Sequence, residues 1–127
     1  MKILIATTHL PPISGGAERV AWETAIRLGR KHDVHILTTG KKNSIKKEAG
    51  IIIHSVPKIT PLILYYSTFG RKMIKDMFEN YQFDILHCHM AGPWGWVLSH
   101  LVKYRKLIVT THGSDVFPTN WKRKRYQ

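Results

Sequence analysis

Short runs of apolar residues recur along the chain, each ending at glycine, proline or a polar residue. Five of them have the length of a single strand, at 2–7, 33–39, 50–56, 83–89 and 106–115. The runs are nearly continuous rather than alternating, which is typical of strands buried on both faces of a sheet. The polar stretch 41–48 between the second and third runs predicts a loop.

Three other segments carry apolar residues at helical spacing, at 15–31, 61–82 and 92–106. In the last of them Pro93 suits a first helical turn. Strands that alternate with helices predict parallel pairing through right-handed crossovers. We therefore predict an α/β fold, with a parallel sheet in the strand order 3-2-1-4-5 and helices flanking it.

Composition places the chain among globular proteins of one domain. It has 127 residues, of which 43% are hydrophobic. No apolar stretch approaches the roughly 20 residues that span a bilayer, and the start of the chain lacks the pattern of a signal peptide. A single cysteine, Cys88, fits a reducing compartment and a buried core position. These features predict a cytoplasmic protein.

The net charge is +12, which favours anionic partners such as phosphates, nucleic acid or anionic lipid. The basic residues are dispersed in four clusters, at 41–47, 71–75, 103–106 and 122–125. A nucleic-acid site usually shows one compact basic face with aromatic residues among the bases. We therefore expect a solvated basic surface and no specific nucleic-acid site.

Polar residues and glycines follow the ends of three predicted strands. His9 and a glycine loop follow the first, His87 and His89 end the fourth, and His112 follows the fifth. In parallel sheets, ligands bind outside the carboxyl ends of the strands. We therefore predict a ligand site at this edge.

Gly15 and Gly16 stand where the first helix is expected to begin. The first N–H groups of a helix have no internal partner and attract phosphate when no side chain blocks them. The loop is neither G-x-G-x-x-G nor a Walker A sequence. We expect these glycines to let a phosphate approach the backbone, with a plain tight turn as the alternative.

Three motifs in order resemble one known family: "PPISGGAERV" at 11–20, "DILHCH" at 84–89 and "VTTHGSD" at 109–115. Together they resemble the N-terminal domain of retaining glycosyltransferases with the GT-B fold, of the group 1 or family 4 type. The resemblance covers residues 1 to about 118. It implies two Rossmann-like domains that face a cleft, the N-terminal one receiving the acceptor and the C-terminal one holding most of the nucleotide-sugar donor.

The resemblance also implies roles for particular residues. His112 matches a histidine beside the transferred sugar and is the predicted catalytic residue. The predicted substrate-binding residues are Gly15, Gly16, Glu18, His87, His89, Trp94, Gly113 and Asp115. No cofactor is expected, because helix N–H groups and basic residues of the donor domain would meet the charge of the leaving diphosphate.

Several alternatives stay open at this level. The histidines at the predicted edge are candidate metal ligands in principle, but no carboxylate or thiol has ligand spacing, so we predict no metal site. Trp94 is a candidate to stack on an acceptor sugar and Trp96 a candidate core residue, or the reverse. The helix at 62–81 has the composition of a membrane-surface helix, although an ordinary amphipathic helix is the simpler interpretation.

The chain ends soon after the fifth predicted strand. By the resemblance we expect residues 1–118 to form an incomplete domain and residues 119–127 a basic tail, with the donor domain and its spaced glutamates absent. We expect such a chain to be inactive alone and to self-associate through the open edge of the fifth strand. Two further readings are a subunit that pairs with a separately encoded donor domain and a basic binding module for anionic partners, including the inner face of a membrane.

Overall fold

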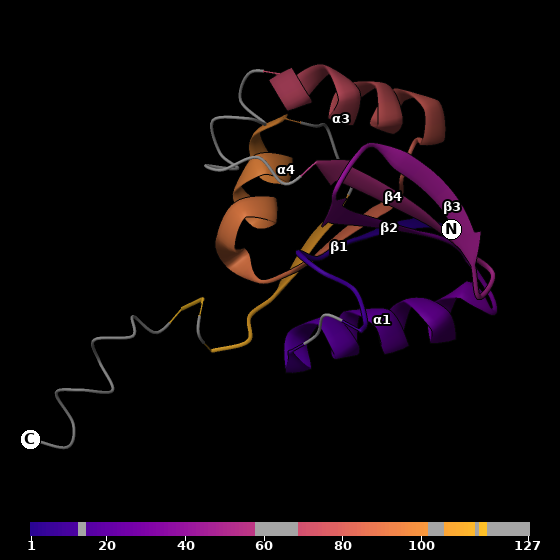
Figure 1. The fold of residues 1–127 in the computed structure, drawn as a ribbon, viewed down its shortest axis with the longest axis vertical. Helices are drawn as coiled ribbons and strands as arrows, with labels where there is room; N and C mark the ends of the chain where they lie inside the picture. Colours follow the sequence, from indigo (N-terminus) through magenta and orange to yellow (C-terminus); the bar gives the residue numbers. More distant parts are fainter. Residues whose placement is uncertain (13–14, 58–68, 102–105, 114, 117–127) are drawn as a thin grey trace, which may run out of the picture.

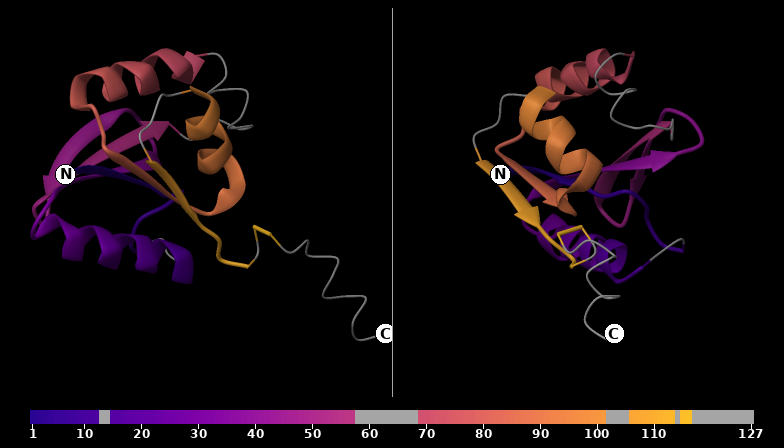
Figure 2. Two further views of the ribbon diagram at one scale, coloured as in Figure 1. Left: turned by 180° about the vertical axis from the view of Figure 1, so that it is seen from behind. Right: turned by 90° about the vertical axis from the view of Figure 1, so that its left-hand side faces the viewer.

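The computed structural model describes residues 1–12, 15–57, 69–101, 106–113 and 115–116, which form three layers (Figure 1). A central sheet is covered on one face by helix α1 and on the other by helices α3 and α4, as both views in Figure 2 show. The arrangement confirms the predicted α/β class.

The sheet has six strands: β1 (Lys2–Ala6), β2 (Asp33–Gly40), β3 (Ser44–Glu48), β4 (Ile51–Pro57), β5 (Ile85–His89) and β6 (Lys106–Thr110). Their order is β3-β4-β2-β1-β5-β6. All neighbours pair in parallel except β3 and β4, which are antiparallel. The five predicted strands are β1, β2, β4, β5 and β6, and they have the predicted neighbours; the sheet has one strand more than predicted.

The additional strand β3 corrects the prediction of a loop over 41–48. Ala49 and Gly50 join β3 to β4 in a tight turn, with φ of 50° and 80°, and Glu48 pairs with Ile51 across it. Positive φ at both central residues is the geometry of two-residue hairpin turns. All five residues of β3 are exposed, so the strand has no buried face that would leave a hydrophobic signal.

The α-helices among the described residues are α1 (Gly16–Gly29), α3 (Phe69–Tyr81) and α4 (Trp96–Leu101). A wide irregular turn, η1 (Ala91–Gly95), precedes α4 and contains the non-helical Gly92. The predicted third helix therefore begins at Trp96 rather than at 92, and the start of the predicted second helix lies outside the described residues. Within the described ranges, no helix is long and apolar enough to cross a membrane.

Alternate residues of each strand point to opposite faces, which divides the core in two. On the α1 face, Ile3 and Ile5 pack with Ala21 and Ala25 of the helix. On the α3 and α4 face, the cluster includes Leu4, Leu86, Cys88, Trp94, Val97 and Leu98. Burial raises the pKa of the Cys88 thiol to about 12, as befits an inert core residue.

Two glycines of α1 give a matched test of packing. A Cβ on Gly29 would lie 2.8 Å from Cγ2 of Ile51, whereas one on Gly16 would meet nothing within 4 Å. We expect Gly29→Ala to lower the free energy of unfolding by about 1–3 kcal/mol through overpacking. Gly16→Ala should leave it unchanged or raise it by up to about 1 kcal/mol. Urea unfolding of both variants checks this, and equal effects would contradict it.

A buried histidine pair lies between β2 and β4, under α3. Nδ1 of His35 is 2.8 Å from Nε2 of His54, and both rings pack edge-on against Tyr81. Burial lowers the pKa of His54 to about 4, helped by the neighbouring His35. Burial also lowers the pKa of His35, opposed by Asp33, whose Oδ1 lies 3.3 Å from Nε2 of His35.

The lowered pKa values of His35 and His54 predict that the protein loses stability in acid. As pH falls from about 6.5 toward 4, the unfolded chain binds protons that the folded chain resists, so the free energy of unfolding decreases, by about 3 kcal/mol for His54 alone. Urea midpoints measured between pH 7.5 and 4.5 test this. The double variant His35→Phe/His54→Leu should show a smaller pH slope than the parent; an unchanged slope would refute the assignment.

Strand β6 forms one edge of the sheet, and on it Ile108 and Val109 are 40% and 41% exposed. An apolar edge strand favours pairing with another chain. We expect the apparent mass in size-exclusion chromatography to rise with protein concentration, and Val109→Lys to suppress the rise. Val20→Lys, at an exposed position of α1, is the control. A strict monomer at every concentration would contradict the prediction.

Candidate functional site

The carboxyl ends of β1, β5 and β6 lie at one edge of the sheet, because these strands are parallel. The first residues of α1 lie beside the end of β6 in each view of Figures 1 and 2. The predicted residues of the glycine loop and of the two histidine segments are therefore on the same side of the molecule.

Three histidine rings lie next to one another at this edge. Nε2 of His87 lies 2.8 Å from Oγ1 of Thr110 on β6, and Nδ1 of His89 lies 3.1 Å from Nε2 of His112. The ring centres of His87 and His89 are 4.5 Å apart, and those of His89 and His112 are 5.3 Å apart. The structure thus brings together the three predicted histidines.

The two histidines of β5 are uncharged at neutral pH. Burial lowers the pKa of His89 to about 4, helped by the positive charges of His87 and His112 when these are protonated. Burial also lowers the pKa of His87. His112 is therefore held against a neutral ring.

The hydrogen bonds indicate which nitrogen of each ring carries the proton. Nε2 of His89 is buried without a hydrogen-bond partner, and an unpaired buried N–H is rarer than an unpaired acceptor. The proton of His89 is thus assigned to Nδ1, which donates to Nε2 of His112. Because Nε2 of His112 then accepts, the N–H of this ring is on Nδ1, where it is a hydrogen-bond donor.

Asp115 holds the loops after β5 and β6 together. One carboxylate oxygen accepts from the backbone N–H of Ala91 at 2.7 Å, and the other accepts from that of His112 at 2.9 Å. The bond from Ala91 is the main cause of the lowered pKa of Asp115. Gly113 lies between His112 and Asp115 in the sequence and has a φ of +86°, a conformation that favours glycine. In this structure Asp115 positions His112, a role that the sequence alone did not indicate.

Gly15 is the residue that precedes α1, and Glu18 folds back on it. Oε2 of Glu18 accepts from the N–H of Gly15 at 3.0 Å, as in a capping box. Glu18 therefore caps its own helix in this structure. Neither a positive φ nor a neighbouring atom requires glycine at position 16, so packing inside the described protein does not explain it.

Trp94 corrects one prediction of the binding set. It is 1% exposed and belongs to the core cluster with Val97 and Leu98, so its ring is not available to stack on a sugar here. Trp96 is 42% exposed and stacks on His100, with ring centres 4.8 Å apart. The core residue is therefore Trp94, and the exposed one is Trp96.

Sequence reasoning also missed Thr110, the hydrogen-bond partner of His87. The register of β5 and β6 places Thr110 opposite His89. Aligning the two predicted strands by their ends would therefore have brought Thr110 next to the histidines of β5. In the part of the chain that the structure describes, no group of three or more His, Cys, Asp or Glu side chains is placed to hold a metal ion.

Comparisons with known proteins show which family the chain is similar to. Residues 14–127 match the family model described as Glycosyltransferase Family 4. An uncharacterized glycosyltransferase of Methanocaldococcus jannaschii is 31% identical over 120 residues, which cover 91% of this chain and 33% of the relative.

Among solved structures, a sucrose-phosphate synthase from Thermosynechococcus elongatus matches with a TM-score of 0.63 and 16% identity, over 87% of this chain and 33% of that one. This second likeness shows the fold alone. The chain spans about a third of the length of both proteins.

Proposed function

Because the chain belongs to glycosyltransferase family 4, we propose that it is the acceptor-side part of an enzyme that transfers a sugar from a nucleotide-sugar donor with retention of configuration. The acceptor is a glycan, a lipid-linked sugar or a small molecule. The observation that carries the proposal is the placement of His112, held by His89 and Asp115 at the strand ends beside the start of α1.

The start of α1 supplies the contact for the donor diphosphate. The first N–H groups of a helix have no partner within the helix and can bind phosphate oxygens, and the helix dipole favours negative charge there. Gly16 presents no Cβ to an approaching ligand, although the packing around it would allow one. Arg19, exposed in the first turn, adds a positive charge. The capping carboxylate of Glu18 would swing away when the diphosphate binds.

His112 supplies a hydrogen bond to the transferred sugar. When Nε2 of His112 accepts from His89, the N–H that His112 can offer to a ligand is on Nδ1, and the hydrogen bond from the His112 backbone to Asp115 holds the residue in place. A preorganised donor of this kind acts by stabilising the transition state rather than by exchanging a proton. No metal enters this mechanism. We further propose that the enzyme works in the cytoplasm.

Nuclear magnetic resonance titration of the labelled chain tests the proposal. We expect millimolar UDP-glucose or GDP-mannose to shift the amide signals of Gly16, Arg19 and His112, and to leave those of His35 and His54 unmoved. Glucose alone and UMP alone are the controls for the two halves of the ligand. Absent shifts with both nucleotide sugars, or shifts confined to other surfaces, would contradict the proposed site.

A further inference from the structure

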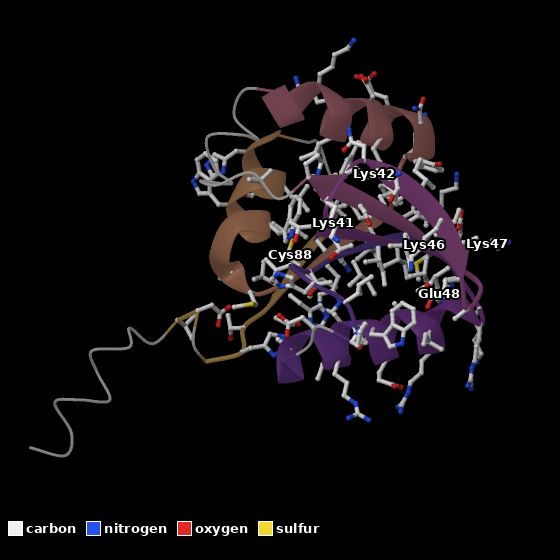
Figure 3. The ribbon with its side chains drawn as sticks, in the orientation of Figure 1. Lys41, Lys42, Lys46, Lys47, Glu48 and Cys88 are labelled. Carbon is white, nitrogen blue, oxygen red and sulfur yellow. The ribbon has the colours of Figure 1, made fainter. Side chains whose placement is uncertain are left out.

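A basic surface lies along β3, at the edge of the sheet opposite β6. We call it the lysine edge: Lys41 and Lys42 in the turn after β2, and Ile45, Lys46 and Lys47 on β3. All five are exposed. Figure 3 shows the four lysines gathered along β3 and the turn before it.

The charge of this edge is largely uncompensated. Nζ of Lys46 pairs with Oε2 of Glu48 at 2.6 Å. The other three lysines form no ion pair with any acid of the described residues. They therefore present a local positive field to solvent. Lys47 lies on β3, which pairs with β4, and Lys41 and Lys42 lie just before it.

An apolar side chain stands among these charges. Ile45 is 66% exposed, more than any other large apolar side chain of the described residues. It borders a cavity of about 470 Å³ between β3, β4 and α3, whose lining includes Val56, Ile74 and Met77. Lys72 adds a further positive charge at this cavity, and Asp76 a negative one.

Protection against strand addition explains only part of this surface. Charged side chains on an edge strand keep other chains from pairing with it. Lys46 and Lys47 lie on the edge strand β3 and provide such charges. Lys41 and Lys42 precede the strand, and an exposed Ile45 works against such protection. The combination of unpaired lysines around one exposed apolar side chain needs a different account.

We propose that the lysine edge docks this protein on the surface of an anionic lipid bilayer. Lysines at such a surface are attracted by the negative potential of the headgroups, while an apolar side chain among them enters the boundary between headgroups and acyl chains. Single-stranded nucleic acid is the weaker fit, because residues 41–48 include no aromatic side chain on which a base would stack. The proposal does not depend on sugar transfer.

Sedimentation with vesicles tests the proposal on the 127-residue chain. We expect binding to vesicles of phosphatidylcholine with 30% phosphatidylglycerol, none to phosphatidylcholine alone, and release at high salt. The triple variant Lys41→Gln/Lys42→Gln/Lys47→Gln should lower the partition coefficient on the order of 100-fold, since each lysine near the surface contributes about fivefold. Its control, Arg27→Gln/Arg30→Gln/Lys31→Gln, removes the same charge from exposed residues near the end of α1 and should retain most of the binding.

The apolar contribution is tested separately. Ile45→Ser should weaken binding several-fold, and Val20→Ser, at a 48% exposed position on α1, should not. Three results would overturn the proposal: no binding to the anionic vesicles, equal losses in the two triple variants, or tighter and equally lysine-dependent binding to single-stranded DNA. Circular dichroism of each variant ensures that a loss of binding is not a loss of fold.

Discussion

Trp94→Ala is expected to lower the free energy of unfolding by about 3–5 kcal/mol, the cost of removing a large aromatic side chain from a packed core. Trp94 is 1% exposed and packs in the same cluster as Leu86, Val97 and Leu98. The expected loss is a large share of the roughly 5–15 kcal/mol that stabilises an ordinary domain. Equilibrium unfolding in urea, followed by far-ultraviolet circular dichroism, measures it.

Trp96→Ala is the matched control, two positions along the chain. Trp96 is 42% exposed, and its described ring contact is with His100 of its own helix. We expect a loss below about 1 kcal/mol. A larger loss for Trp96→Ala than for Trp94→Ala would mean that the core assignment is wrong, and would make Trp94 available again for a bound sugar.

The sequence around α4 indicates which of its residues face the core. Trp94, Val97 and Leu98 have the spacing i, i+3, i+4 of one helical face, and all three are buried. Pro93 instead suggested a helix that begins near 92. The irregular turn at Ala91–Gly95 delays the helix without changing which residues face the core, and such a turn leaves no periodic signal.

Strands β1, β2, β4 and β5 were predictable because each is largely buried by the layers around it and so carries a continuous apolar run. Strand β6 carries such a run as well, although it is half-exposed at the edge of the sheet. β3 was not predictable, because all of its residues are exposed and its pairing depends on a turn through Ala49 and Gly50. Of these two, Ala49 is uncommon at positive φ. The general layout thus followed from burial, and the miss fell where the sheet meets solvent.

In the candidate site, too, the layout was predictable and the individual contacts were not. The topology of parallel strands was enough to bring His87, His89 and His112 to one edge. The contacts among them depend on the register of β5 with β6 and on a loop conformation, neither of which composition determines. The two carboxylate residues of the predicted site were hardest to assign, since Asp115 and Glu18 accept hydrogen bonds from backbone N–H groups of the protein itself.

His112→Ala is expected to lower kcat by about 10²- to 10³-fold in an enzyme that joins this domain to a donor-binding domain. The reason is the loss of a positioned hydrogen-bond donor that we propose contacts the transferred sugar. Nucleotide affinity should change little, because we propose that the start of α1 and the donor-binding domain hold the nucleotide. The 127-residue chain alone is expected to show no transfer, with or without the substitution.

The decisive result is a fall in kcat with the fold retained. The ring of His112 is only half-buried, and its described contacts are with His89 and, through the backbone, Asp115, so His112→Ala should melt within a few degrees of the parent. His100→Ala is the control, since His100 bonds only within its own helix among the described residues, and it should keep full activity. Unfolding of His112→Ala would make His112 a structural residue, and normal turnover would remove it from the site.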